Sequence, residues 1–175
     1  MATRKSMWIL FGILIIAAWL LGSVTQAGAQ TYTMKCRWTG HFPKMHIIEV
    51  GDVPGHILCV GESAGVSSCD DGGVATISGK FTTDLTQGNG ISQGYRVSTY
   101  EDGSTLWEKY QNIVTPSPDG KTSRYEGTSE FIKGTGRFEG IQGSGSYTGK
   151  RLAPTPGVGA QYYTDSIGTY TLPSK

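Results

Sequence analysis

Runs of β-branched and aromatic residues alternate with turn-forming residues over most of the chain, and this pattern predicts strands. No window has the 3.6-residue period of an amphipathic helix. Many strands of modest length with frequent turns are typical of a β-sandwich or a closed barrel, so we predict an all-β fold. The predicted strands cover residues 32–39, 45–50, 56–60, 74–83, 91–100, 105–114, 123–132, 144–152 and 167–172. Residues 63–73 are predicted to form a loop.

Two Asp-Gly dipeptides set the strand register in the middle of the chain. Asp102-Gly103 is typical of a two-residue hairpin turn, and Asp119-Gly120 marks a second turn. The first turn pairs Tyr100 with Thr105, Val97 with Glu108 and Tyr95 with Tyr110. The second turn pairs Lys109 with Glu130, Val114 with Tyr125 and Glu108 with Phe131.

Because successive strand residues point to opposite sides, these registers sort residues 95 to 131 into two faces. The face expected to point inward carries Tyr95, Val97, Leu106, Glu108, Tyr110, Asn112, Val114, Tyr125 and Phe131. The polar face carries Arg96, Lys109, Glu126 and Glu130. Trp107, Ile113 and Ile132 break its polarity and could mark a covering segment or a subunit contact. A slip of one residue in either turn would invert the assignment.

The first 29 residues have the pattern of a secretory signal peptide. Arg4 and Lys5 give a positive start, residues 8–21 form an apolar run, and Ala27-Gly28-Ala29 suits signal peptidase. The apolar run is short for a membrane span. We predict cleavage after Ala29, which leaves residues 30–175 as one secreted or periplasmic domain with no membrane association. The alternative is an uncleaved N-terminal anchor.

The composition narrows the range of partners. The 175 residues carry a net charge of +1, only 17% are charged and 26 are Gly. A general basic field is absent, and no strip of Arg and Lys is interleaved with the aromatic residues, which argues against nucleic acid as a partner. The abundance of Gly supports a turn-rich β domain.

Three cysteines lie in the mature part of the chain, at positions 36, 59 and 69. A secreted protein folds in an oxidising compartment, but an odd number of cysteines allows at most one internal bridge. Cys59–Cys69, Cys36–Cys59 and Cys36–Cys69 all remain open. The short loop favours Cys59–Cys69 slightly, and the spare thiol is then a buried small apolar group or an intermolecular partner.

Several glycine-based landmarks occur between residues 79 and 147. They are Gly79-Lys80-Phe81-Thr82-Thr83, Gly88-Asn89-Gly90, Gln93-Gly94-Tyr95 and residues 134–147 with their Gly-Thr-Gly-Arg-Phe-Glu-Gly core. This set resembles the small β-barrels related to allene oxide cyclase and to the plant dirigent proteins. The resemblance implies an antiparallel barrel of about eight strands with an internal cavity, often assembled into dimers or trimers, so we expect a homo-oligomer. No catalytic residue of a family member can be matched to a position in this sequence.

Glu108 is the best candidate for chemistry, because the predicted register places it inside with aromatic neighbours. A carboxyl group desolvated in an aromatic cavity can act as a general acid or base. The alternative is that Glu108 lies near a barrel mouth in water. The predicted ligand-binding residues on the same face are Tyr95, Tyr110, Asn112, Tyr125 and Phe131.

The predicted function is therefore non-enzymatic: binding of a small apolar or aromatic molecule in the cavity, or a structural role in an oligomer. The alternative is a cofactor-independent cyclase or isomerase that uses Glu108 and the cavity tyrosines. We expect no cofactor and no metal site, because His41, His46 and His56 have no zinc-binding spacing.

Overall fold

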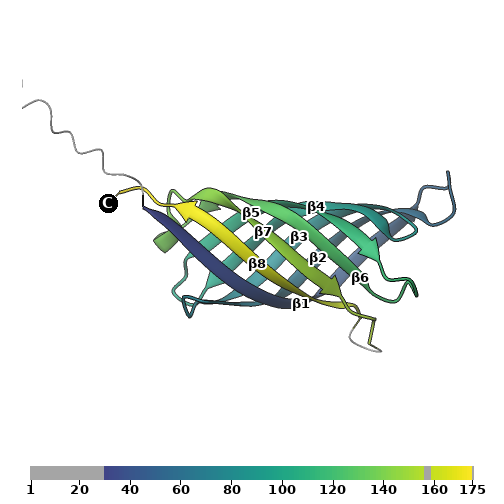
Figure 1. Cartoon of the computed structure of the whole chain (residues 1–175), viewed down its shortest axis with the longest axis horizontal. Helices are drawn as coiled ribbons and strands as arrows, with labels where there is room; N and C mark the ends of the chain where they lie inside the picture. The colour runs from purple at the N-terminus through teal and green to yellow at the C-terminus, as the bar shows by residue number, and fades with distance from the viewer. Residues whose placement is uncertain (1–29, 156–158, 175) are drawn as a thin grey trace, which may run out of the picture.

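The strands of this chain close into a single antiparallel barrel in the computed structural model, which describes residues 30–155 and 159–174 (Figure 1). Each strand pairs with its neighbours in chain order, and β1 pairs with β8 to complete the ring. The strands are β1 (Thr31–Glu49), β2 (His56–Cys69), β3 (Val74–Thr86), β4 (Asn89–Tyr100), β5 (Thr105–Pro116), β6 (Ser123–Gly134), β7 (Gln142–Arg151) and β8 (Gln161–Thr171). The predicted signal peptide, residues 1–29, lies outside the described residues.

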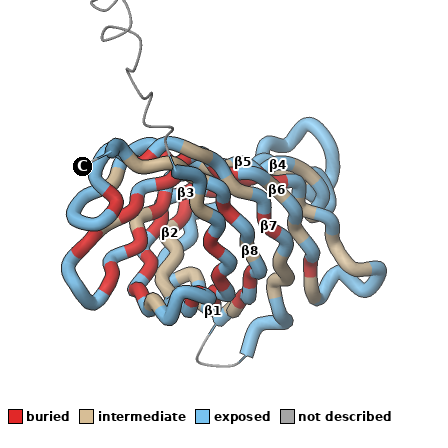
Figure 2. The backbone as a smooth tube through the Cα atoms, turned by 60° about the vertical axis from the view of Figure 1, so that its left-hand side comes forward, coloured by how far each residue is buried: buried red, intermediate tan, exposed pale blue. Residues whose placement is uncertain are grey.

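The period-two pattern of the sequence becomes an inside and an outside of the barrel. In β3, Ala75, Ile77, Gly79 and Phe81 are buried, and the residues between them are exposed. Figure 2 shows the same alternation of buried and exposed positions along the other strands. No helix in the described part of the chain is long and apolar enough to cross a membrane.

Two predicted boundaries near the start of the barrel are wrong, and the last strand, β8, begins at Gln161 rather than at residue 167. The predicted strands 32–39 and 45–50 form one long strand, β1, whose register shifts between His41 and Lys44. Pro43 lies in that shift, where its missing N–H costs no regular ladder bond. Residues 63–69, predicted as loop, continue β2. Their small side chains allow close strand contact: a Cβ on Gly65 would collide with the backbone of Thr39.

The predicted register of β4 against β5 is also wrong, by one residue. The loop has three residues between Tyr100 and Ser104, whose backbones are bonded (Tyr100 N to Ser104 O, 2.9 Å), and Gly103 has a φ of 79°. This geometry fits a three-residue hairpin loop with Gly in the left-handed region, rather than a two-residue turn. Arg96 therefore pairs with Glu108, and the faces of β4 are inverted relative to the prediction. By contrast, the predicted pairs of β5 with β6 are confirmed.

One end of the barrel, called the closed end below, is filled by side chains. The 3-10 helix η1 (Gly136–Phe138) lies there and buries Phe138. The buried cluster consists of Met34, Cys36, Trp38, Cys69, Ala75, Ile77, Tyr100, Leu106, Phe131, Phe138 and Ile141. The opposite end carries the connections after β1, β3, β5 and β7 and is called the open end.

The disulfide joins Cys36 to Cys69, so the prediction of Cys59–Cys69 is wrong. Cys36 and Cys69 are directly paired residues of β1 and β2. Cys59 and Cys69 belong to the same strand, and ten residues of extended chain separate them by roughly 33 Å. The remaining thiol, Cys59, is buried, as expected for a spare cysteine.

Candidate functional site

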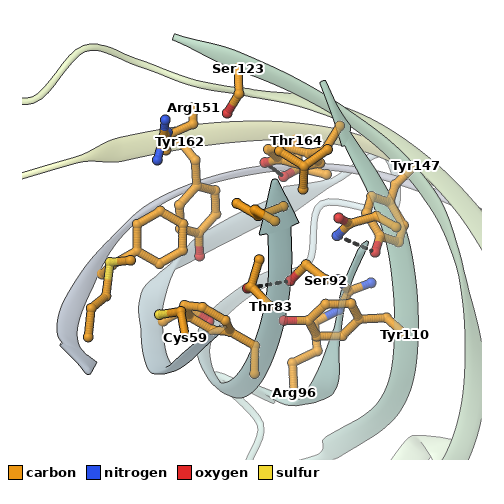
Figure 3. Close-up of a pocket in the computed structure, with 18 of the residues that line it drawn as sticks. Cys59, Thr83, Ser92, Arg96, Tyr110, Ser123, Tyr147, Arg151, Tyr162 and Thr164 are labelled. Atoms are coloured by element: carbon orange, nitrogen blue, oxygen red, sulfur yellow. Dashed lines mark hydrogen bonds between the residues drawn. The ribbon is translucent and has the colours of Figure 1, made fainter. Parts of the chain in front are cut away.

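Above the closed end, the barrel encloses a cavity of about 190 Å3 that leads toward the open end (Figure 3). Aromatic side chains form much of its wall: Trp38, Phe42, Phe81, Tyr110, Tyr125, Tyr147 and Tyr162. Aliphatic side chains complete the apolar surface: Met45, Ile47, Ile57, Ile77, Leu85 and Val114. The polar lining residues include Thr83, Ser92, Arg96, Asn112, Ser123, Arg151 and Thr164.

The cavity exists because inward positions differ in size between the two halves of the barrel. Toward the closed end they hold large side chains such as Leu106 and Phe131, which pack together. Toward the open end several hold small ones, among them Thr83, Ser92 and Ser123. The sequence thus fills one half of the barrel and leaves space in the other.

A buried ion pair separates the cavity from the packed core. Arg96 of β4 donates to Glu108 of β5 through Nε (2.6 Å) and Nη2 (2.8 Å). Ser129 of β6 adds a third hydrogen bond to the Glu108 carboxylate, at 2.8 Å. Burial opposes the charge on Arg96, but the adjacent Glu108 carboxylate outweighs it, so the pKa of Arg96 is raised. Arg96 therefore keeps its charge, and the three hydrogen bonds satisfy the polar atoms that join the pair.

Aromatic rings surround the Arg96 guanidinium. Its carbon Cζ lies 3.6 Å from the ring centre of Trp38, within stacking distance, and 5.2 and 5.1 Å from those of Tyr110 and Tyr147. Such contacts are favourable because the ring faces carry negative electrostatic potential. Arg96 is thus fixed both by its carboxylate and by three aromatic neighbours, and it forms the rigid floor of the cavity.

Glu108 is inside, as predicted, but Arg96 rather than Glu108 forms part of the cavity wall. Glu108 borders the packed core beside Ser129 and Phe131. Exchange of a proton between Glu108 and a molecule in the cavity would require the ion pair to open. The geometry gives Glu108 the role of holding Arg96 in position, and its catalytic role stays a prediction.

The buried and half-buried tyrosines of the wall act as neutral hydrogen-bonding groups. Burial raises the pKa of Tyr110, Tyr125, Tyr147 and Tyr162 above the usual value of 10. Tyr147 accepts a hydrogen bond of 3.2 Å from Asn112 Nδ2. These hydroxyl groups stay protonated over the physiological pH range.

Three of the predicted ligand-binding residues line the cavity: Tyr110, Asn112 and Tyr125. Phe131 is buried but belongs to the packed closed end. The expected inward position of Tyr95 is wrong, because the three-residue loop turns it outward and leaves it 50% exposed. Whether these residues bind a ligand stays a prediction.

Other lining residues were not singled out from the sequence. Phe81 and Tyr147 lie in predicted strands, whose alternation signals an inner and an outer face, but no turn of recognisable length links those strands to the central hairpins. Tyr162 lies outside the predicted strands. The inward position of Arg96 was missed because of the register error. Nothing in the sequence identifies Arg151 as a cavity residue, since one Arg at the end of a strand is an ordinary surface residue.

The three histidines do not come together. His41 and His46 are exposed on β1, whereas His56 begins β2. The described residues contain no group of three or more His, Cys, Asp and Glu side chains that could hold a metal ion.

His56 instead joins two carboxylates near the open end. Its Nδ1 lies 2.6 Å from Asp52 in the loop after β1, and its Nε2 lies 2.9 Å from Asp84 on β3. Hydrogen bonds to Asp52 and then to Asp84 raise the pKa of His56, and the bond to His56 lowers the pKa of Asp52. The imidazole therefore connects the loop to the wall of the barrel through both of its ring nitrogens.

Comparisons with known proteins give a likeness of fold. No protein-family model matches the chain, and no curated protein matches its sequence. Among solved structures, the barrel is similar to the pterocarpan synthase dirigent protein GePTS1, with 15% identity, a TM-score of 0.50, and coverage of 82% of this chain and 92% of that one. The pterocarpan synthase dirigent protein PsPTS1 is similar at 13% identity and a TM-score of 0.48, over 83% and 97% of the two chains. The predicted resemblance to dirigent-like barrels is confirmed for the fold.

Proposed function

We propose that this protein is a secreted barrel that binds a small apolar or aromatic molecule in its cavity. The observation that carries the proposal is the continuous aromatic and aliphatic wall around a space of about 190 Å3. An engineered apolar cavity of about 150 Å3 already accommodates benzene. The space here suits a molecule of one or two rings.

The arrangement of the interior favours ligand binding over a purely structural role. A structural barrel gains stability when its interior is packed, because empty space forfeits dispersion contacts. The closed end is packed in this way, around Leu106 and Phe138. The other half keeps an apolar wall with small residues and a fixed polar floor, which is the usual make-up of a small-molecule site.

Secretion is part of the proposal and rests on two features. The disulfide Cys36–Cys69 is typical of proteins that fold in an oxidising compartment. The first 29 residues carry the signal-peptide pattern. Sequencing of the N-terminus of the exported protein should yield Gln30 as the first residue; a mature protein beginning at Met1 would contradict it.

Binding can be measured with naphthalene-2-carboxamide as a neutral probe. Trp38 lines the cavity, so a Trp107→Phe background makes it the reporter in a protein without residues 1–29. We expect saturable quenching of the Trp38 fluorescence. Ser92→Phe should abolish it by filling the cavity, whereas Gln93→Phe, on the outward face of the same strand, should not.

Circular dichroism establishes that each variant is folded. Folded protein without saturable binding, or equal binding by the Ser92→Phe and Gln93→Phe variants, would overturn the proposal.

A further inference from the structure

Among the described residues, the charged side chains that line the cavity wall are those of Arg96 and Arg151, and none is a carboxylate. The charge of Arg96 is balanced by Glu108. Arg151 has no ion-pair partner among the described residues. The wall therefore carries one unbalanced positive charge.

Arg151 is the last residue of β7 and is partly buried. It pairs with Ser123 of β6 on one side and with Tyr162 of β8 on the other. Ser123 is only 3% exposed, and Tyr162 only 7%. Figure 3 shows these three residues together at one end of the cavity, with Arg96 and Tyr110 at the other.

The polar groups of the wall are incompletely satisfied. Within the described chain, two buried side-chain nitrogen or oxygen atoms lack a hydrogen-bond partner: Arg151 Nε and Asn112 Oδ1. Both residues line this cavity. Buried polar atoms are rarely left without partners, and a guanidinium N–H is a costly one to leave unpaired. The wall is thus complete only when another molecule supplies an acceptor to Arg151.

We propose that the ligand is an aromatic carboxylate whose acid group binds Arg151 and whose ring system lies against the aromatic wall. The proposal rests on the proposed function and names the chemical class of the ligand. A carboxylate matches the planar donors of a guanidinium and forms charge-assisted hydrogen bonds with them. Ser123, which pairs with Arg151 in the sheet, brings a hydroxyl group to the same end of the cavity as a further donor.

Arg96 is unsuited to this role, which fixes the orientation of the ligand. Its Nε and Nη2 already donate to Glu108, and one face of its guanidinium stacks on Trp38. A second carboxylate there would have to compete with Glu108. The acid group therefore lies at Arg151, and the rings point toward the floor.

The aromatic character of the ligand follows from the wall. Phe42 packs against Phe81 and Tyr162, with ring centres 5.4 and 5.1 Å apart. Together with Tyr125 and Tyr147 these rings offer flat surfaces, which suit a planar molecule better than a flexible chain. Immobilising an alkyl chain would also cost more conformational entropy.

The test compares 2-naphthoate with naphthalene-2-carboxamide, a neutral molecule of nearly equal shape, by isothermal titration calorimetry on the protein without residues 1–29. We expect 2-naphthoate to bind tighter by about tenfold or more, as for a charge-assisted hydrogen bond. Arg151→Gln should abolish this preference, so that the two probes bind with equal affinity. Arg124→Gln removes an equal charge from the neighbouring outward position and should preserve the preference.

The possible results of this experiment distinguish failure of the acid-binding proposal from failure of the proposed function. If both probes bind but 2-naphthoate has no advantage, or Arg151→Gln retains that advantage, the acid-binding role of Arg151 is overturned and the proposed function stands. If the folded protein binds neither probe, the proposed function itself fails. Octanoate that binds as tightly as 2-naphthoate would overturn the aromatic part of the proposal. Should Arg151→Gln not fold, Arg151→Lys keeps the charge and should retain only part of the preference.

Discussion

Arg96 and Glu108 face each other across β4 and β5 inside the barrel, joined by hydrogen bonds of 2.6 and 2.8 Å. Their side chains are each 6% exposed. Ser129 ties the same carboxylate to β6. A charged pair at this depth is tolerated only because each partner satisfies the other, so it fixes three strands relative to one another at the floor of the cavity.

Replacement of Glu108 alone should strongly destabilise the folded protein. Glu108→Gln leaves the Arg96 cation buried without a counter-ion, and we expect a loss of about 3–5 kcal/mol in the free energy of unfolding. Urea unfolding followed by circular dichroism measures it. The double variant Arg96→Met with Glu108→Leu should lose less than the sum of the single changes, because no charge is then stranded.

The exposed pair Arg37–Asp165 provides a control for this comparison. Asp165→Asn should change the unfolding midpoint little, since solvent screens an exposed pair. If Glu108→Gln proved no more harmful than Asp165→Asn, the buried pair would not be holding the floor together.

The disulfide Cys36–Cys69 should make a measurable contribution to stability. The bridge joins residues 33 positions apart, and its removal in a Cys36→Ser, Cys69→Ser variant should cost roughly 3–4 kcal/mol by the chain-entropy relation. Urea unfolding of the oxidised wild type and the variant gives the difference.

Thiol titration tests the pairing itself. Cys59 is 3% exposed, and burial raises its pKa. One thiol should therefore react with a disulfide reagent in denatured, oxidised protein and almost none in native protein. A Cys59→Ser variant should show no thiol under either condition; a remaining free thiol would mean that Cys59 takes part in a bridge.

Gly61 should tolerate no side chain while Phe81 lies opposite. A Cβ at Gly61 would approach Phe81 Cζ to 2.5 Å. Gly61→Ala should thus destabilise the barrel by about 1–3 kcal/mol, as overpacked cores do. Adding Phe81→Leu removes the clashing ring, and thermal unfolding should show a smaller loss for Gly61→Ala in that background. Equal losses in both backgrounds would place the cost elsewhere.

The cluster of His56 with Asp52 and Asp84 should make stability depend on pH. The pKa of His56 is raised from 6.5, so its contribution is complete below pH 6.5 and disappears as the pH rises through the folded value. The pKa of Asp52 is lowered from 3.8, so its contribution is present above that value and disappears as the pH falls. The contribution of this cluster to the free energy of unfolding is therefore largest between pH 3.8 and pH 6.5.

Chemical unfolding at pH 5.5 and 8.5 tests this expectation. The midpoint difference between wild type and His56→Gln should be larger at pH 5.5. His46→Gln, which removes an exposed imidazole elsewhere on β1, serves as the control. A His56→Gln effect that is independent of pH would show that the imidazole stabilises the loop without its charge.

The sequence predicted the fold class well because alternation and turn residues are local signals. It paired β5 with β6 correctly across the turn at Asp119-Gly120. The predicted pairing of β4 with β5 was wrong because an Asp-Gly dipeptide indicates a turn but not the number of residues in the loop. One extra loop residue inverted β4, which exchanged Tyr95 for Arg96 in the interior. Because of this one-residue error in the loop length, the position of Arg96 at the floor of the cavity was not predicted.

Other failures came from contacts between distant segments. The second half of β2 is rich in Ser and Gly, which favour loops when read locally, but pairing with β1 and β3 holds it extended. The disulfide was misassigned for the same reason, since Cys69 is brought beside Cys36 only by that pairing. The cavity wall depends on the closure of the whole ring, which no local pattern specifies.

Closure of the ring has a topological consequence. Thr31, at the start of β1, pairs with Thr171, at the end of β8, so the two ends of the barrel sequence lie side by side at the closed end (Figure 1). A short linker between them would create a circular permutant with new termini at the 101–103 loop. The cyclic order of strands has no intrinsic beginning, and the cavity at the far end would keep every one of its lining residues.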